Sequence, residues 1–269
     1  MTSGPVNLHS ALQLESLAEG VLEAHITEGW DVRGNPHGGY LLALVSGAMA
    51  TVVPQPHPVA IAATYLAVPH FGPAELHVEP VRLGKRQSTA SVRLVQDGLE
   101  RVRATATFGH LPASDPDHPA GPVDAPEVAP PEECHRHEIL ADAEGEEIRL
   151  HRSLDLRLAP GTGWVVGEPT GTGELVGWLR LADGTPPDVA ATLVFSDGMP
   201  PSIFEERGRV GHVPTLQLTT HLFALPSPGW VLGRFHTRVV NGAFVGEDGD
   251  LWDGTGKLVA TTRQLALLV

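Results

Sequence analysis

Three polar residues, Asp197, Thr215 and Gln264, lie in the second half of the chain where a similar first half carries other residue types. A carboxylate within an apolar segment can accept a proton, and burial raises its pKa towards neutral pH, as a general base requires. A hydroxyl and a side-chain amide can orient the same water molecule by hydrogen bonds. The pattern therefore predicts one active site, to which one half gives the polar groups while the other half supports them.

The internal repeat rests on two pairs of segments. HGGYLLALVSGAM (37–49) resembles VAATLVFSDGM (189–199) as a mostly apolar helix, and the strand pattern of 68–108 resembles that of 225–264. Superposing the copies pairs Asp197 with Ser46, Thr215 with Pro58, and Gln264 with Phe108. Each half is therefore expected to hold one long helix and about five or six strands, a compact α+β arrangement.

Each member of the trio also has an ordinary structural explanation. Asp197 is closely followed by Gly198 and Pro200, so it fits a helix-terminal or loop acid as well. Thr215 fits a strand residue with a satisfied hydroxyl, and Gln264 fits a surface position on the last strand. Because one pattern selects all three residues, the catalytic interpretation requires that they share one cavity.

Patterning divides the chain into an N-terminal repeat at 1–112, a linker at 113–145 and a C-terminal repeat at 146–269. The linker is rich in proline and acids, which is typical of a surface segment, with disorder as the alternative for its middle. The other predicted elements are a short polar helix and then a strand within 11–30, a buried helix at 37–52, strands at 59–68, 74–83, 87–96 and 99–109, and a second buried helix within 186–208.

Composition argues against several classes of protein. The chain has 18 Lys and Arg against 32 Asp and Glu, a formal net charge of −14, so no nucleic-acid partner is expected. Cys134 is the single cysteine, and CHRH (134–137) lacks the second half of a zinc pattern, so we expect a solvated linker there and no metal. The longest apolar run (40–53) is too short for a membrane span, and the N-terminus lacks a signal-peptide pattern; a cytoplasmic location is expected.

Several segments together resemble a known family. They are HVEPVRLGKRQSTASVRLVQDG (77–98), GWLRLADG (177–184), LVFSDGMPPS (193–202), PTLQLTTHLF (214–223) and GKLVATTRQLAL (256–267). They are similar to strands and a helix of the acyl-CoA thioesterase II family of the thioesterase superfamily. The resemblance implies a double hotdog fold: two tandem repeats, each a long helix wrapped by an antiparallel sheet.

The resemblance also implies a function in lipid metabolism. The chain would hydrolyse an acyl-CoA thioester to a carboxylic acid and CoA, by direct attack of a water held by Asp197, Thr215 and Gln264. The thiolate is a good leaving group, so no cofactor is expected, and a homo-oligomer is expected by analogy. The chain departs from the family at Gln217, where an acid is common, and at His37, which is closer to single-hotdog thioesterases.

The start of the first helix, His37-Gly38-Gly39-Tyr40, is the predicted oxyanion and substrate site. Helix N-termini present unpaired N–H groups and the positive end of the helix dipole, and glycines let a thioester carbonyl approach the backbone. The N–H of Gly38, Gly39 or Tyr40 is therefore a candidate oxyanion donor. A tight turn that needs glycine for packing is the alternative, and His37 is expected to cap the helix rather than act as a base.

The densest basic cluster, Arg82, Lys85 and Arg86 around Gly84, is a weak candidate for binding the phosphates of CoA, with a solvated turn as the alternative. Two other functions remain open: a non-catalytic acyl-CoA or lipid-binding hotdog protein, and an enoyl-CoA hydratase-like hotdog enzyme. The hydratase would need a His/Asp pair near one helix, which the sequence does not clearly supply. The absence of a G-x-S-x-G motif argues against an α/β-hydrolase.

Overall fold

The computed structural model describes residues 4–112, 124–138, 141, 145–209 and 211–269, and its main element is one 13-stranded antiparallel sheet. The first-half strands, in sheet order, are β1 (Leu14–Ala18), β2 (Val21–Ile26), β6 (Gly72–Arg82), β7 (Ser88–Gln96), β8 (Leu99–Gly109) and β5 (His57–Tyr65). The second-half strands follow as β12 (Thr215–Leu222), β15 (Leu258–Leu267), β14 (Phe244–Asp253), β13 (Val231–Asn241), β11 (Glu174–Leu181), β10 (Leu154–Leu158) and β9 (His135–Arg136). The two halves meet where β5 pairs with β12.

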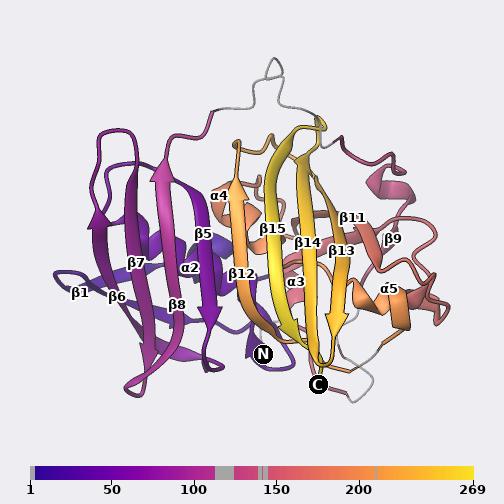
Figure 1. Ribbon diagram of the computed structural model, residues 1–269, viewed down its shortest axis with the longest axis horizontal. Helices are drawn as coiled ribbons and strands as arrows, with labels where there is room; N and C mark the ends of the chain where they lie inside the picture. The colour runs from indigo at the N-terminus through magenta and orange to yellow at the C-terminus, as the bar shows by residue number, and fades with distance from the viewer. Residues whose placement is uncertain (1–3, 113–123, 139–140, 142–144, 210) are drawn as a thin grey trace.

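Helices line the inner side of this sheet, behind the strands in Figure 1. The two central ones, α2 (Gly38–Ala50) and α4 (Val189–Phe195), pack against each other. The remaining short elements are α1 (Leu8–Ala11), α3 (Leu150–Ser153), α5 (Ile203–Arg207), the 3-10 turns η1 (Pro131–Glu133) and η2 (Trp164–Val166), and a separate ribbon of β3 (Asp31–Val32) and β4 (Asn35–Pro36). This is the predicted double hotdog, in which each repeat buries an apolar helix against a curled sheet.

Burial follows the predicted patterns. Strand β7 alternates strictly, with Ala90, Val92 and Leu94 buried beneath the helices while the residues between them face outwards. Helix α2 is buried on nearly all sides because it lies between the sheet and α4. The predicted helix at 37–52 and the four strands that follow it are confirmed to within a few residues.

The pseudo-symmetry of the halves can be followed residue by residue. His37 and Asp188 are the N-caps of α2 and α4, and each accepts a hydrogen bond from the N–H three residues later. Ser46 and Asp197 lie nine residues after their respective caps, so this pairing from the sequence is supported. The second half thus carries a carboxylate at the position where the first half carries a buried serine.

The strand pairing from the sequence needs a correction. Pro58 lies opposite Phe108 in the β5–β8 ladder, whereas Thr215 lies opposite Ala266 in the β12–β15 ladder. If Thr215 corresponds to Pro58, the residue that corresponds to Gln264 is Ala106, since Ile61 pairs with Ala106 as Leu218 pairs with Gln264. The superposition of Gln264 on Phe108 was therefore two residues out of register. Both ladders have a bulge at the corresponding place, between Pro58 and Ala60 and between Thr215 and Gln217, so the register is the same in the two halves.

Three further expectations differ from the structure. The predicted polar helix near residue 11 is instead the end of α1 followed by β1, because Gly20, at φ +70°, turns β1 back along β2. The second helix is broken into α4 and α5, since Pro200 and Pro201 cannot continue it. His137, expected in a solvated linker, is buried, and desolvation lowers its pKa to about 3.

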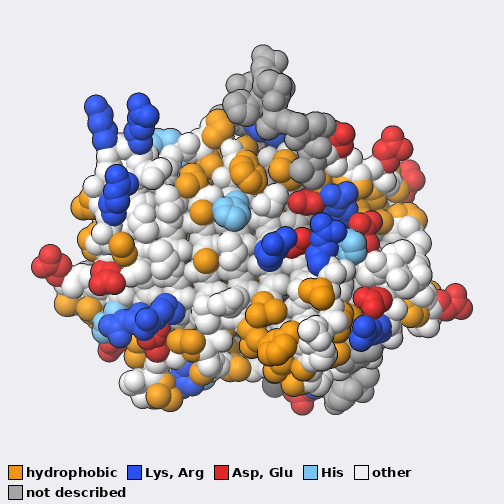
Figure 2. Space-filling model, viewed as in Figure 1, with side chains coloured by type: hydrophobic (Ala, Val, Ile, Leu, Met, Phe, Trp, Pro, Cys, Tyr) orange, Lys and Arg blue, Asp and Glu red, His pale blue; other side chains and the backbone are white. Residues whose placement is uncertain are grey.

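The predicted domain boundaries remain a prediction. Residues 113–123, the middle of the expected linker, lie outside the described residues. His135–Arg136, also assigned to the linker, pair with β10 and extend the second-half sheet. Within the described residues no helix is long and apolar enough to cross a membrane. On the outer face of the sheet, a group of Lys, Arg, Asp and Glu side chains lies over the second-half strands, just right of centre in Figure 2. Asp248 of β14 forms ion pairs with Arg238 of β13 and Arg263 of β15.

Candidate active site

A pocket of about 690 Å³ lies where the two halves meet. Its wall combines the β3–β4 ribbon, the start of α2 and the end of β5 from the first half with the segment after α4, the start of β12, and parts of β14 and β15 from the second. Asp197, Thr215 and Gln264 all line it, together with Gly38 and Tyr65. The pocket is thus shared between the halves, as the distribution of polar residues predicts.

The trio is assembled by three separate elements. Asp197 comes directly after Ser196, the C-cap of α4, Thr215 is the first residue of β12, and Gln264 lies on β15. Thr215 Oγ1 lies 3.5 Å from Asp197 Oδ1, and Gln264 Nε2 donates a hydrogen bond to Thr215 Oγ1. The three side chains therefore form one chain of polar contacts inside the pocket, although their catalytic role remains a prediction.

One oxygen of the Asp197 carboxylate contacts groups of the first half of the chain, and the other faces Thr215 in the pocket. Its Oδ2 accepts a hydrogen bond from the Gly39 N–H at 2.9 Å and lies 3.2 Å from His37 Nε2. Its Oδ1 accepts a longer hydrogen bond from the Thr215 hydroxyl at 3.5 Å, and the Gln264 side chain also interacts with this carboxylate. Burial raises the pKa of Asp197, and the His37 ring and the Gly39 N–H partly oppose that rise. A carboxylate with a raised pKa, facing two polar side chains in a pocket, suits the removal of a proton from water.

His37 is the N-cap of α2, as expected. Its Nδ1 accepts a hydrogen bond from the Tyr40 N–H, so the proton of the neutral ring lies on Nε2. Nε2 is 2.7 Å from the backbone oxygen of Asp197, which accepts that proton as a hydrogen bond. The result is a His/Asp pair that joins the two halves. The sequence does not clearly supply this pair, because the partners lie 160 residues apart in the chain.

The candidate oxyanion donors can now be distinguished. The Gly39 N–H is engaged by Asp197 and the Tyr40 N–H by His37, so neither is free to bind a substrate oxygen in this arrangement. No described residue accepts a hydrogen bond from the Gly38 N–H, and Gly38 lines the pocket. Tyr65 holds the next peptide unit, Gly38–Gly39, because its hydroxyl donates to the Gly38 carbonyl at 2.7 Å. Of the three candidates, Gly38 is the one placed to act as the donor.

Close packing also explains the two glycines. A Cβ added to Gly39 would lie 2.6 Å from the carbonyl oxygen of Val194 and 3.0 Å from that of Leu193, both backbone atoms of α4. A Cβ on Gly38 would lie 2.6 Å from Asp197 Oδ2. The packing alternative therefore holds for Gly39, where α2 and α4 touch, while a side chain at Gly38 would displace the carboxylate itself.

Gly39→Ala is expected to lower the free energy of unfolding by about 1–3 kcal/mol, because backbone atoms of α4 must move to admit the methyl group. Gly47 offers a matched control on the same helix, since its added Cβ meets only Leu14 Cδ1 at 3.9 Å. Gly47→Ala should raise stability by up to about 1 kcal/mol through helix propensity. Urea denaturation of both variants checks this, and equal effects would contradict the contact between the helices.

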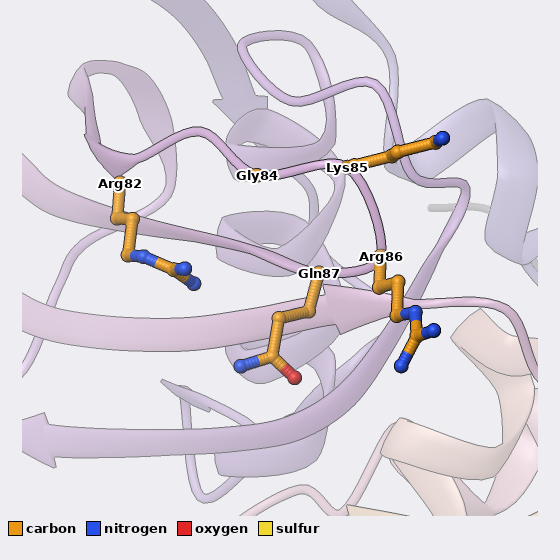
Figure 3. Close-up of a pocket in the computed structure, with 5 residues that line it drawn as sticks. All are labelled: Arg82, Gly84, Lys85, Arg86 and Gln87. Atoms are coloured by element: carbon orange, nitrogen blue, oxygen red, sulfur yellow. The ribbon is translucent and has the colours of Figure 1, made fainter.

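The basic cluster lies away from this pocket. Arg82, Lys85 and Arg86 surround a separate hollow of about 370 Å³ at the turn between β6 and β7, with Gly84 and Gln87 (Figure 3). That turn is at the end of the sheet where β8 meets the start of β5, whereas the Asp197 pocket is at the opposite end of β5, beside Tyr65. None of the three cations lines the Asp197 pocket. Their binding of CoA phosphates remains a prediction.

Tyr65 and Glu247 are pocket residues that the sequence did not predict. Tyr65 ends β5, and burial raises the pKa of its hydroxyl well above the ordinary value, so it stays protonated and can donate to Gly38. Glu247 lies on β14, where Val245, Glu247, Gly249 and Leu251 share the buried face. The alternation of β14 was the available signal for Glu247, because it places an acid among inward positions.

Comparison with known proteins identifies the family. Residues 131–268 match the acyl-CoA thioesterase C-terminal domain, and residues 26–109 match the acyl-CoA thioesterase N-terminal domain. Together they cover most of the chain, which therefore belongs to the acyl-CoA thioesterase family. The resemblance inferred from the sequence is confirmed at this level.

Individual relatives agree with this assignment. An uncharacterised protein of Mycobacterium tuberculosis is 29% identical over 92% of this chain and 91% of its own length. A crystal structure of a provisionally named thioesterase II from Thermobifida fusca matches with a TM-score of 0.87 at 24% identity, over 98% of both chains. The acyl-CoA thioesterase II TesB2 of Mycobacterium marinum matches with a TM-score of 0.73 at 19% identity, also over 98% of both. These two structures establish the shared fold.

Proposed function

We propose that this chain hydrolyses acyl-CoA thioesters to a free carboxylic acid and CoA. The observation that carries the proposal is the state of Asp197, whose Oδ2 is fixed by the Gly39 N–H while Oδ1 faces Thr215 and Gln264 in the shared pocket. A base with a raised pKa, two groups that can orient a water and a free backbone N–H lie together in that pocket. Family membership supports thioester chemistry for this arrangement.

The steps follow from these positions. A water oriented by Thr215 and Gln264 gives a proton to Asp197 Oδ1 as its oxygen attacks the thioester carbonyl carbon. The carbonyl oxygen gains negative charge, which the Gly38 N–H stabilises. The carbon–sulfur bond then breaks, the electron pair leaves with the sulfur, and the proton returns from Asp197 to the thiolate or to solvent. The proposed reaction needs no cofactor, because the thiolate is a good leaving group.

Release of free thiol from a panel of acyl-CoA thioesters tests the proposal. Hydrolysis predicts thiol release by the wild-type chain in excess of a no-enzyme blank. Gln264→Ala should lower kcat about tenfold, because it removes a hydrogen bond worth about 1–1.5 kcal/mol to the oriented water. Binding of acyl-CoA without any release of thiol would instead support the non-catalytic lipid-binding alternative.

A hydratase acting on enoyl-CoA is the second candidate, and the His37–Asp197 pair is the observation in its favour. Against it, both ring nitrogens of His37 already have hydrogen-bonding partners, and its side chain is only 6% exposed. The two functions give different products. Hydration of an enoyl-CoA removes the absorbance of its conjugated double bond and leaves the thioester intact, whereas hydrolysis releases thiol.

A further inference from the structure

A second carboxyl group lines the active-site pocket beside the polar trio. Glu247 of β14 lies opposite Gln264 of β15 on one side and opposite Thr237 of β13 on the other. Side chains paired across antiparallel strands point to the same face, with Cβ atoms about 4.5–5.5 Å apart. Glu247 is 9% exposed and lines the pocket. Its carboxyl group is therefore in the pocket wall, one strand away from Gln264.

One oxygen of this carboxyl group is anchored and the other is available. Glu247 Oε2 accepts hydrogen bonds from the Ser202 N–H at 2.7 Å and the Ser202 hydroxyl at 2.5 Å. The Ser202 hydroxyl is in turn 2.8 Å from Thr237 Oγ1. No described residue forms a hydrogen bond with Glu247 Oε1. The anchoring network thus fixes the orientation of the group and leaves Oε1 for a ligand.

The charges near Glu247 favour its protonated form. Desolvation and the nearby carboxylates of Asp197 and Asp248 together raise its pKa to about 7, and the two hydrogen bonds from Ser202 oppose that rise. Asp248 is itself paired with Arg238 and Arg263, and no described Lys or Arg forms an ion pair with Glu247. The side chains that contact it or lie opposite it, Ser202, Thr237 and Gln264, are neutral. Near neutral pH the carboxyl group can therefore both donate and accept hydrogen bonds.

Beyond Gln264 and Thr237, the wall next to this group continues with apolar residues. Val245 and Ala266 form the next inward pair along β14 and β15, and Met199 and Phe204 line the same pocket. A plain alkyl chain lying along this wall would cover Oε1 without giving it a partner, which is costly for a buried polar group. A chain that carries a hydrogen-bonding group at this point would satisfy it.

We propose that Glu247 forms a polar subsite that selects acyl-CoA thioesters with a hydroxyl or oxo group on the acyl chain, a few carbon atoms from the thioester. The inference rests on the proposed hydrolysis and names its substrate class. Sites that bind a substrate hydroxyl discriminate strongly against analogues that lack it, because their own polar groups are then left unpaired.

The test compares acyl-CoA thioesters of one chain length, either unsubstituted or with a hydroxyl or oxo group at each carbon in turn. For wild type, kcat/KM should peak at one substituted position, at least about tenfold above the unsubstituted chain. Glu247→Leu should abolish or reverse that ratio, whereas the control Ser46→Ala, at a buried position outside the pocket, should keep it. If the ratio is unchanged in Glu247→Leu, or if wild type shows no substituted optimum, the subsite does not exist.

Two further measurements apply if the leucine variant does not fold or if no thioester is hydrolysed. Glu247→Gln has the same shape and still accepts a hydrogen bond from the Ser202 N–H, so it should fold if the leucine variant does not. It should bind both substituents at all pH values, whereas wild type should lose its preference for the oxo group above about pH 7, where the carboxylate can no longer donate. If no thioester is hydrolysed, affinities for non-hydrolysable thioether analogues still show whether the substituent is recognised, and an equal affinity for all analogues would overturn the subsite.

Discussion

Asp197→Asn is expected to lower kcat by about 10²–10⁴-fold, the usual effect of losing a positioned general base. An asparagine oxygen can still accept the Gly39 N–H, so the loop after α4 should keep its place. The amide then presented to Thr215 can donate a hydrogen bond but cannot take a proton from water. Release of thiol under saturating acyl-CoA measures the loss.

The matched control is Ser46→Ala, which changes the pseudo-symmetric position on α2. Ser46 is buried but has no part in the proposed site, so kcat should change less than about twofold. Unfolding curves for both variants establish that they are folded. If Asp197→Asn retains wild-type kcat while Ser46→Ala also does, the base is another group, and the assignment of Asp197 fails.

The pH profile gives an independent check of the same residue. A general base acts in its deprotonated form, so kcat/KM should rise with pH through the pKa of Asp197 in the free enzyme. Because burial raises that pKa, the acid limb should lie above the range of an ordinary aspartate. This limb should disappear in Asp197→Asn. A limb that persists in the variant would indicate that Glu247 or another acid titrates instead.

Much of the fold was predictable because its signals are local. The alternation of β7 and β8 and the all-round apolar character of α2 identify these elements without tertiary information. Asp197 could be paired with Ser46 because both helices start from a capping residue at the same spacing. Gln264 could not be placed in register, because the pairing of β15 with β12 is set by contacts between strands that are far apart in the sequence.

The rest of the site depends on contacts between distant segments. His37 meets Asp197 only because α2 and α4 pack together across the pseudo-symmetry axis. His137 was expected to be solvated, yet it packs against His151 and Trp164, which no pattern near residue 137 indicates. Glu247 lies in a strand with Asp248 and Asp250, and such a run of acids is usually a solvated surface. Only the alternation of side chains along β14 distinguishes Glu247, on the buried face, from Asp248 and Asp250, which are partly exposed on the opposite face.

Glu247→Gln is expected to change the pH dependence of stability by about 3 kcal/mol. The pKa of Glu247 is about 7 in the folded chain against an ordinary 4.5, and each unit of difference corresponds to about 1.4 kcal/mol. Between these values the folded state holds a proton that the unfolded chain has released. The free energy of unfolding of wild type should therefore fall as pH rises from about 4.5 to 7 and then level off, a loss that the glutamine variant avoids.

Urea denaturation of both proteins at about pH 4 and pH 8 measures this effect. The other titrating groups cancel in the difference between variant and wild type, so that difference should shift in favour of glutamine by about 3 kcal/mol between the two pH values. Asp197→Asn should reduce the shift, because it removes a charge that raises the pKa of Glu247. A difference that does not vary with pH would mean that Glu247 ionises normally. It could then not offer a proton to an oxo group, and the polar subsite would recognise hydroxyl groups alone.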